Sequence, residues 1–273
     1  MPFGMGQGPR LNVFGPGSER SIQSNFERLS SGKRINRAAD DASGLAISES
    51  LQALSRSLAA ADQNTARARA VTAVKEGGLS QIGDITTRMR ELAVQAADGS
   101  LSENDRKFID EEFQALKSEL GRVSETTEFN DHELLAGSEQ QLGVQVGAGT
   151  SASDQLNVAV GGVTTGTLGV DGLSVSGTDG SAAVAAIDSI DAALEKVNSA
   201  RAENGASYNR LEMARESASE RRVGLLEAES RIRDADYAEE TSNLARNKIL
   251  QRARVAVSAQ ANQAASLTLN LLR

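Results

Sequence analysis

The chain has 273 residues and a formal net charge of −8, with 6 Phe, 2 Tyr, 3 Pro and neither Trp nor Cys. Because few aromatic side chains are available to bury large areas, the composition favours helices packed side by side over a thick globular core. The lack of cysteine excludes disulfides, iron–sulfur clusters, Cys-ligated zinc and thiol nucleophiles, and the negative charge argues against a nucleic-acid partner.

The two ends of the sequence bear on targeting. Met1 to Gly17 is rich in Gly and Pro and shows no charged segment followed by an apolar run, so we expect no cleaved secretory signal. At the other end, Val255 to Leu272 carries no charge, but seven of its residues are Ser, Thr, Asn or Gln. That polarity argues against a membrane span and favours a helix buried among other helices.

Helical periodicity begins near residue 18. Apolar residues at Ile22, Phe26 and Leu29 are spaced by 4 and 3, which predicts a helix that ends just before Gly32. Glycine is the usual residue immediately after a helix C-terminus, because it adopts the left-handed conformation without strain. The first predicted element is therefore a helix of about four turns, followed by a short basic loop.

A much longer helix is predicted next. Asp40 or Asp41 can cap it, and its apolar residues then recur every 3 or 4 positions as far as about Ala97. Fifty helical residues span roughly 75 Å, a length typical of a coiled coil or bundle. A capping box at residues 102–105 starts a further helix, with regularly spaced apolar residues from Ile109 onward.

The middle of the chain has a different pattern. Residues 131–180 are rich in Gly, Val, Thr and Ser, and apolar residues alternate with polar ones in three runs that start near Leu142, Leu156 and Leu168. Glycine-rich turns separate the runs. The pattern predicts two or three hairpins, enough for a small β element.

Residues 181–273 return to helical periodicity. One heptad position is apolar except at Asn204. The second heptad position, called here the companion position, changes along the chain from Ile and Leu to Arg and Tyr. This change predicts packing against charged helices. Asp234 or Asp236 can cap a terminal helix. The companion position comprises Ile187, Leu194, Arg201, Tyr208, Arg215 and Arg222. The stripe along the terminal helix comprises Ile249, Ala253, Ala256, Gln260, Ala264, Leu267 and Leu271.

Catalytic motifs are not found in the sequence. His132 is the only histidine, so metal sites with two His ligands are excluded, and its polar neighbours indicate a surface turn. The glycine-rich run at 143–150 lacks the Gly-Lys-Ser/Thr of a phosphate-binding loop. Adjacent carboxylates such as Glu111 and Glu112 point about 100° apart on a helix, a poor geometry for shared acid–base chemistry. We therefore predict no enzyme activity, no cofactor and no metal.

Several motifs, in order along both ends of the chain, resemble those of bacterial flagellins. They are ERLSSGKRIN at 27–36, ADDASGLAI at 39–47, RMRELAVQAADG at 88–99, RIRDADYAEE at 231–240 and AQANQ at 259–263. The resemblance covers residues 20–135 and 190–273, roughly three quarters of the chain.

The resemblance implies a mainly α fold: a long antiparallel helical coiled-coil bundle from both chain ends, with a small β-hairpin-rich insertion in the middle. In flagellins the ends form an inner coiled coil around a narrow channel, and a helical domain lies outside it. The Gly- and Pro-rich start departs from the family pattern, so we expect a shortened inner N-terminal helix. The implied segments are an inner-core segment at 1–42, helical filament-core parts at 43–135 and 181–233, a variable β element at 136–180 and an inner-core helix at 234–273.

The resemblance also implies a function. The chain would be a structural subunit that self-assembles into the extracellular bacterial flagellar filament for motility, after secretion by type III export. Implied partners are other flagellin subunits, flagellar cap and hook-junction proteins, and a secretion chaperone that binds the C-terminal helix. The residues predicted to lie on the assembly helices are Ile22, Phe26, Leu29, Ile249, Ala253, Ala256, Ala264, Leu267 and Leu271.

A further implied partner is a vertebrate Toll-like receptor, which senses flagellins through their helical domain. The matching positions are Arg88, Leu92 and Glu112, although Thr87 stands where recognised flagellins often have Gln. Subunit contacts are the main interpretation of these residues. Two alternative functions stay open: a hook–filament junction protein of the same family, and a non-polymerising coiled-coil binding module.

Overall fold

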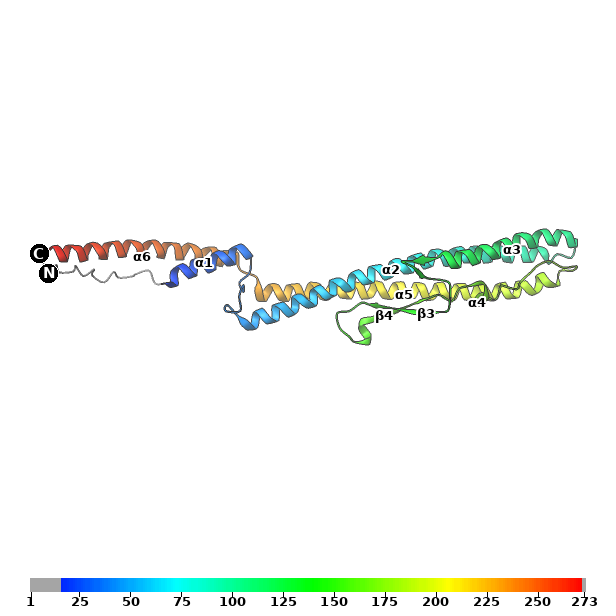
Figure 1. The fold of residues 1–273 in the computed structure, drawn as a ribbon, viewed down its shortest axis with the longest axis horizontal. Helices are drawn as coiled ribbons and strands as arrows, with labels where there is room; N and C mark the ends of the chain where they lie inside the picture. Colours follow the sequence, from blue (N-terminus) through cyan, green and yellow to red (C-terminus); the bar gives the residue numbers. More distant parts are fainter. Residues whose placement is uncertain (1–15, 272–273) are drawn as a thin grey trace, which may run out of the picture. The chain divides into compact units, whose positions relative to one another are not determined.

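The computed structural model describes residues 16–271, so the prediction for the Gly- and Pro-rich start lies outside the described residues for positions 1–15 (Figure 1). The elements are α1 (Pro16–Ser31), α2 (Ala42–Ala96), α3 (Glu103–Thr126), β1 (Glu128–Phe129), β2 (His132–Glu133), β3 (Gln140–Gln145), the 3-10 turn η1 (Ala152–Asp154), β4 (Gln155–Val160), α4 (Thr165–Leu168), α5 (Ser181–Arg233) and α6 (Tyr237–Leu271). The mainly α fold with a small β-hairpin insertion is confirmed.

The described residues form two compact units. Those up to Ala53 and those from Gly224 onward make the terminal unit, and residues 54–223 make the central unit. Within the central unit α2 and α5 run antiparallel, since Asp62 of α2 pairs with Arg215 near one end and Arg90 pairs with Asp191 near the other. The predicted antiparallel pairing of the two halves of the chain is therefore present in this unit.

Local sequence signals set the helix boundaries. Gly32 follows α1 with φ +70°, as a C-cap glycine does. Asp41 caps α2, because its carboxylate accepts from the backbone N–H three residues later at 2.9 Å. Ser102 and Asp105 form the predicted capping box of α3. Asp236 caps α6 by accepting two backbone N–H groups at 2.8 and 3.2 Å.

The main hydrophobic core of the central unit lies where α2, α3 and α5 pack together. Apolar side chains from all three helices are buried there, and Phe113 of α3 is 0% exposed. The loop that precedes α5 also contributes to this core. The buried residues include Leu79, Ile82, Met89, Leu92, Phe113, Leu120, Val170, Val175, Ile190 and Val197.

Gly78 and Arg106 lie at opposite ends of this core and determine how the neighbouring segments pack there. A Cβ at Gly78 would lie 2.7 Å from both Leu135 Cδ1 and Thr127 Oγ1, so a larger residue here would force the side chains of the chain after α3 to shift away from α2. At the other end, the buried guanidinium of Arg106 donates to the carbonyls of Ala96 and Asp98 at 2.9 and 2.8 Å. It thereby satisfies carbonyl groups left free where α2 ends.

The predicted polar position of α5 packs against charged groups of α2. Arg201 donates to Glu76 at 2.8 Å, Arg215 donates to Asp62 at 2.9 Å, and the guanidinium of Arg69 lies 4.7 Å from the ring centre of Tyr208. The prediction that a half-polar seam would meet charged helices is therefore confirmed.

The β element is smaller than the largest prediction. β1 pairs with β2 and β3 pairs with β4, both antiparallel, with Gln140 opposite Val160 at one end of the second ladder. The prediction of a third hairpin, from the run near Leu168, is wrong. That segment forms α4 and an irregular stretch, because Thr164 caps a helical turn and Gly169 ends it with φ +82°.

Candidate functional site

The pairing of α1 with α6 is the main feature of the terminal unit. The buried carboxylate of Glu240 accepts from Asn25 Nδ2 at 2.5 Å and from Arg28 Nη1 at 2.9 Å. Asn247 Nδ2 donates to Asn25 Oδ1 at 2.9 Å, and Lys248 Nζ lies 5.0 Å above the ring of Phe26. These polar contacts join α1 to the first three turns of α6.

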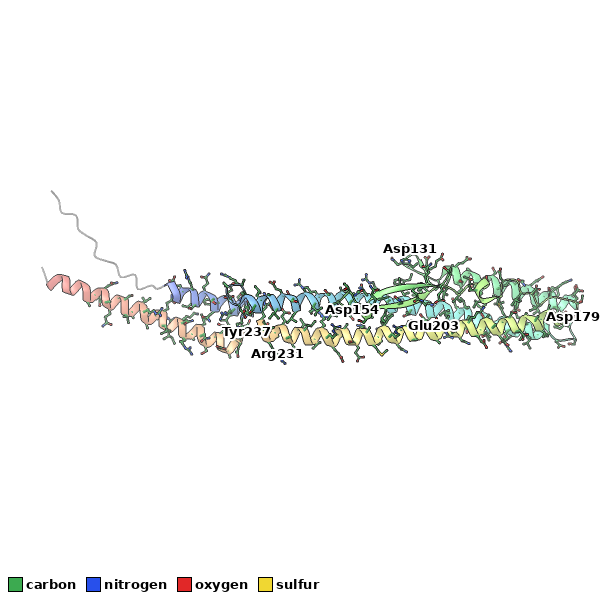
Figure 2. All side chains as sticks on the ribbon, turned by 90° about the horizontal axis from the view of Figure 1, so that it is seen from below. Asp131, Asp154, Asp179, Glu203, Arg231 and Tyr237 are labelled. Carbon is green, nitrogen blue, oxygen red and sulfur yellow. The ribbon has the colours of Figure 1, made fainter. Side chains whose placement is uncertain are left out.

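Backbone contacts tie the loop after α1 to the junction between α5 and α6. The Arg34 N–H donates to the Arg233 carbonyl at 2.6 Å, and the Ala235 N–H donates to the Gly32 carbonyl at 3.0 Å. The hydroxyl of Tyr237, labelled in Figure 2, donates to the Leu29 carbonyl at 2.9 Å. The flagellin-like motifs at 27–36 and 231–240 therefore lie against each other.

The acidic pair that follows this loop holds the chain in place. Asp40 accepts from the backbone N–H groups of Arg37 and Asn36 at 3.0 and 3.1 Å, and the Arg37 contact chiefly lowers the pKa of Asp40. The pKa of Asp41 is lowered mainly by the N–H of Gly44. Both carboxylates are thus structural acceptors that fix the turn between α1 and α2.

Most of the predicted assembly residues are accessible in this unit. Phe26 is 49% exposed, while Ile22 and Leu29 are half-buried. On α6, Ile249 is 66% exposed, and Ala253, Ala256 and Ala264 are also exposed. The side chains of Leu267 and Leu271 lie outside the described residues. Beyond its first turns, α6 therefore presents apolar side chains to solvent, as the described part of the chain shows.

Sequence reasoning did not single out a further set of apolar residues on α6. Leu250, Val255 and Val257 are 46%, 46% and 62% exposed. They lie beside the predicted stripe rather than on it, so α6 is apolar over more than one face. Apolar side chains on more than one face of a helix favour packing against more than one neighbour.

The three predicted receptor residues do not form one exposed surface. Arg88 donates to Glu112 at 2.9 Å and to Glu91 at 2.8 Å, and all three side chains are about half-exposed. Leu92, however, is 2% exposed in the core. Its place on the apolar stripe of α2 could have indicated this burial, because a stripe residue faces the partner helices.

His132 is exposed in the β1–β2 hairpin, beside Asn130 and Asp131, which both adopt positive φ. Within residues 16–271 no group of three His, Asp or Glu residues could hold a metal ion. None of the helices in that range is both long and apolar enough to pass through a membrane.

Comparisons with known proteins agree with these observations. Residues 17–140 match the bacterial flagellin N-terminal helical region, and residues 187–272 match the bacterial flagellin C-terminal helical region. The chain is 40% identical over 251 residues to a flagellin from Halalkalibacterium halodurans, covering 92% of each chain. It is 37% identical over 265 residues to a flagellar filament 33 kDa core protein from Treponema phagedenis, covering 93% of each. The crystal structure of Bacillus cereus flagellin is similar at 27% identity and a TM-score of 0.50, covering 57% of this chain and 88% of that one.

Proposed function

Because this chain belongs to the bacterial flagellin family and is a structural subunit of the flagellar filament, we propose that its terminal helices α1 and α6 make the contacts that join subunits. The observation that carries this proposal is the exposure of apolar side chains along α6, including Ile249, Val255 and Val257. Apolar residues on several sides of one helix fit a position among neighbouring helices of other subunits.

A physical argument supports the coupling of α6 to assembly. The described contacts between α1 and α6 reach as far as Asn247 and Lys248, and beyond them Ile249, Val255 and Val257 are exposed. Ordering each backbone residue costs about 1–2 kcal/mol, and most of the stability of a helix in a protein comes from the packing of its apolar side chains. Neighbouring subunits would supply the missing packing, and the helix would become stable as the filament grows.

The setting of a filament subunit suggests further partners and a location. We propose that the chain is secreted by type III export and acts outside the cell, where it meets flagellar cap and hook-junction proteins. A secretion chaperone would cover the same apolar faces of α6 before export. That role fits the exposed residues from Ile249 onward, which would otherwise promote premature association.

We propose that the main role of the exposed Arg88–Glu112 pair is to make contacts between subunits. Recognition by a vertebrate Toll-like receptor would use the same two side chains. Leu92 would contribute by supporting α2 from the core, because its side chain is 2% exposed.

Truncation tests the role of α6. We expect a variant that lacks residues 250–273 to stay folded, since the core of the central unit lies within residues 79–197, and to form no filaments. Circular dichroism melting would report the core, and electron microscopy after seeding would report filaments. Full-length protein is the control. Filaments formed by the truncated chain would contradict the proposal, and full-length protein that forms only short caps would favour the junction-protein alternative.

A further inference from the structure

A single aromatic residue projects from the outer face of α3. Phe108 is 69% exposed, the highest value among the large hydrophobic residues that the structure describes. It follows the buried Arg106 by two residues and precedes the buried Phe113 by five. At about 100° per residue, both offsets direct Phe108 away from the face that α3 buries. The central unit itself therefore leaves this ring uncovered.

An apolar cleft lies beyond the other end of α3. It has a volume of about 390 Å³ between α2, the β1–β2 hairpin and β3. Its apolar lining comprises Ala68, Val71, Phe129, Leu134, Leu142 and Val144. A cavity of about 150 Å³ is large enough to hold benzene, so this cleft has room for a phenyl ring.

The charges around the two features are complementary. Asp105 and Glu111 each lie three residues from Phe108, on the same exposed face of α3, whereas the nearby Glu112 is paired with Arg88. The polar side chains that line the cleft include Arg67 and His132 and no carboxylate. Arg67 donates to Asn64 Oδ1 at 2.6 Å but forms no ion pair with any residue the structure describes.

Two carboxylates of the β1–β2 hairpin, Asp131 and Glu133, have to be weighed against this complementarity. They line a neighbouring hollow on the hairpin, which shares His132, Leu134 and Leu142 with the apolar cleft, and neither carboxylate lines the cleft itself. Asp131 projects outward from the hairpin in Figure 2. The cleft itself therefore offers a basic and apolar surface to an incoming group.

Phe108 and the cleft cannot meet within one copy. From Phe108 to the end of α3 the helix rises by about 27 Å, and the cleft begins after that end. Figure 2 marks the two regions by Asp179, near the start of α3, and Asp131, near its end. A contact between unlike surfaces at opposite ends of a unit joins copies head to tail, and such contacts build an open helical filament when the rotation between copies does not close a ring.

We propose that Phe108 of one copy inserts into the apolar cleft of a second copy of this chain, with Glu111 facing Arg67. This contact adds a site in the central unit to the terminal helices, and it rests on the proposed filament function. In this contact the cleft binds the side chain of Phe108, and the exposed ring becomes buried between two subunits.

Crosslinking tests which residues meet, and a chain without cysteine gives no background. Subunits carrying Phe108→Cys would be mixed with subunits carrying His132→Cys, polymerised, and treated with a short bismaleimide. We expect a crosslinked dimer from the mixed filaments and none from the mixed monomers. The matched control replaces His132→Cys by Met213→Cys, a position on α5 that is 61% exposed. Crosslinking to position 132 that is no stronger than to position 213 would overturn the proposal.

Polymerisation measurements test the energetics independently. We expect Phe108→Ser to raise the critical concentration for polymerisation about tenfold or more, because burial of a Phe side chain supports at least that change in an association constant. The monomer should melt at an unchanged temperature, since the residue is exposed. Met213→Ser is the control and should leave the critical concentration unchanged. An unchanged value for Phe108→Ser, with filaments still formed by the unaltered chain, would overturn this contact but not the filament function.

Charge reversal tests the predicted partner of Arg67. Arg67→Glu and Glu111→Arg should each raise the critical concentration, and a chain with both changes should recover most of the loss. Absence of recovery in the doubly altered chain, when both single variants are impaired and fold normally, would contradict the pairing. An unaltered chain that never polymerises would instead contradict the proposed function itself.

Discussion

Two stretches of the same helix pair differ in what they bury. From about residue 79 to 96, α2 packs against α3 and α5, and the buried side chains are almost all apolar. From about residue 61 to 76, α2 faces α5 and the β3–β4 hairpin, and it buries Thr65, Thr72 and Lys75. Three helices can enclose a dry core, whereas two helices leave an open seam that polar groups can share with water. The third helix therefore decides how apolar the interface becomes.

Asn204 shows this difference at one heptad position. It lies one heptad from Val197, and both side chains are buried, at 4% and 1% exposure. Asn204 Nδ2 donates to the Thr72 carbonyl at 2.9 Å, but its Oδ1 has no hydrogen-bond partner within the described residues. The polar seam thus tolerates a buried acceptor without a partner, at a cost in stability.

The largest expected effect on stability comes from placing a polar residue in the apolar core and an apolar residue in the polar seam. Val197→Asn should reduce the free energy of unfolding by about 3 kcal/mol, because the apolar core offers the amide no partner. Asn204→Leu should raise it by about 1 kcal/mol, because the unsatisfied Oδ1 is removed. Urea unfolding of the monomer, followed by circular dichroism, measures both. Equal losses at the two positions would contradict the distinction between core and seam.

The boundary between the two stretches offers the next largest effect. Gly78→Ala should destabilise the monomer by about 1–3 kcal/mol, because the new Cβ would overlap Leu135 and Thr127. A Cβ at Gly77 would meet no atom within 4 Å, so Gly77→Ala should stabilise the monomer by about 0.5–1 kcal/mol. Thermal melting of the matched pair checks the opposite signs. Stabilisation by both changes would show that the hairpin region does not hold close to α2.

The smallest expected effect is a pH dependence at Lys75. Its Nζ donates to the Ala159 carbonyl at 2.8 Å, and burial lowers its pKa from 10.5, against the opposing effect of Glu203, Glu139 and Glu76. A folded-state pKa below the unfolded value penalises the charged folded form. The penalty is complete below the folded pKa and fades as the pH rises towards 10.5.

The measurement compares the unaltered chain with Lys75→Met. The difference in free energy of unfolding between the two should shrink or change sign in favour of the unaltered chain as the pH rises from 7 to about 10. The Met variant provides the control for other groups that titrate in this range. A constant difference across the range would mean that Lys75 is not penalised by burial.

Much of this fold could be predicted because its signals are local. The spacing of apolar residues predicts α2 and α5, and the change of the companion position to Arg201 and Arg215 predicts packing against charged helices. The third β segment could not be predicted, because long-range contacts hold it. Asp110 accepts from the Val175 N–H at 2.7 Å, and Lys117 donates to the Leu173 carbonyl at 3.1 Å. Neither contact leaves a trace in the local alternation of residues.

The candidate site was predictable in part for the same reason. The apolar stripe of α6 is visible in the sequence, and its described members are exposed in the structure. The burial of Leu92 beside the exposed Arg88 was not recognised, because motif matching assigns a role to a residue without its orientation. The cleft next to Phe129 could not be found, since it is formed by segments that are up to 81 residues apart in the chain.

The junction of the two chain halves has a consequence for the order of folding. The contacts of Gly32 and Arg34 with residues 233–235 join positions about 200 residues apart. A loop of that length closes slowly, because many conformations must be searched before the ends meet. Almost the entire polypeptide must therefore be available before α1 can meet its partner. We expect the terminal unit to become ordered after the central unit, whose core lies within residues 79–197.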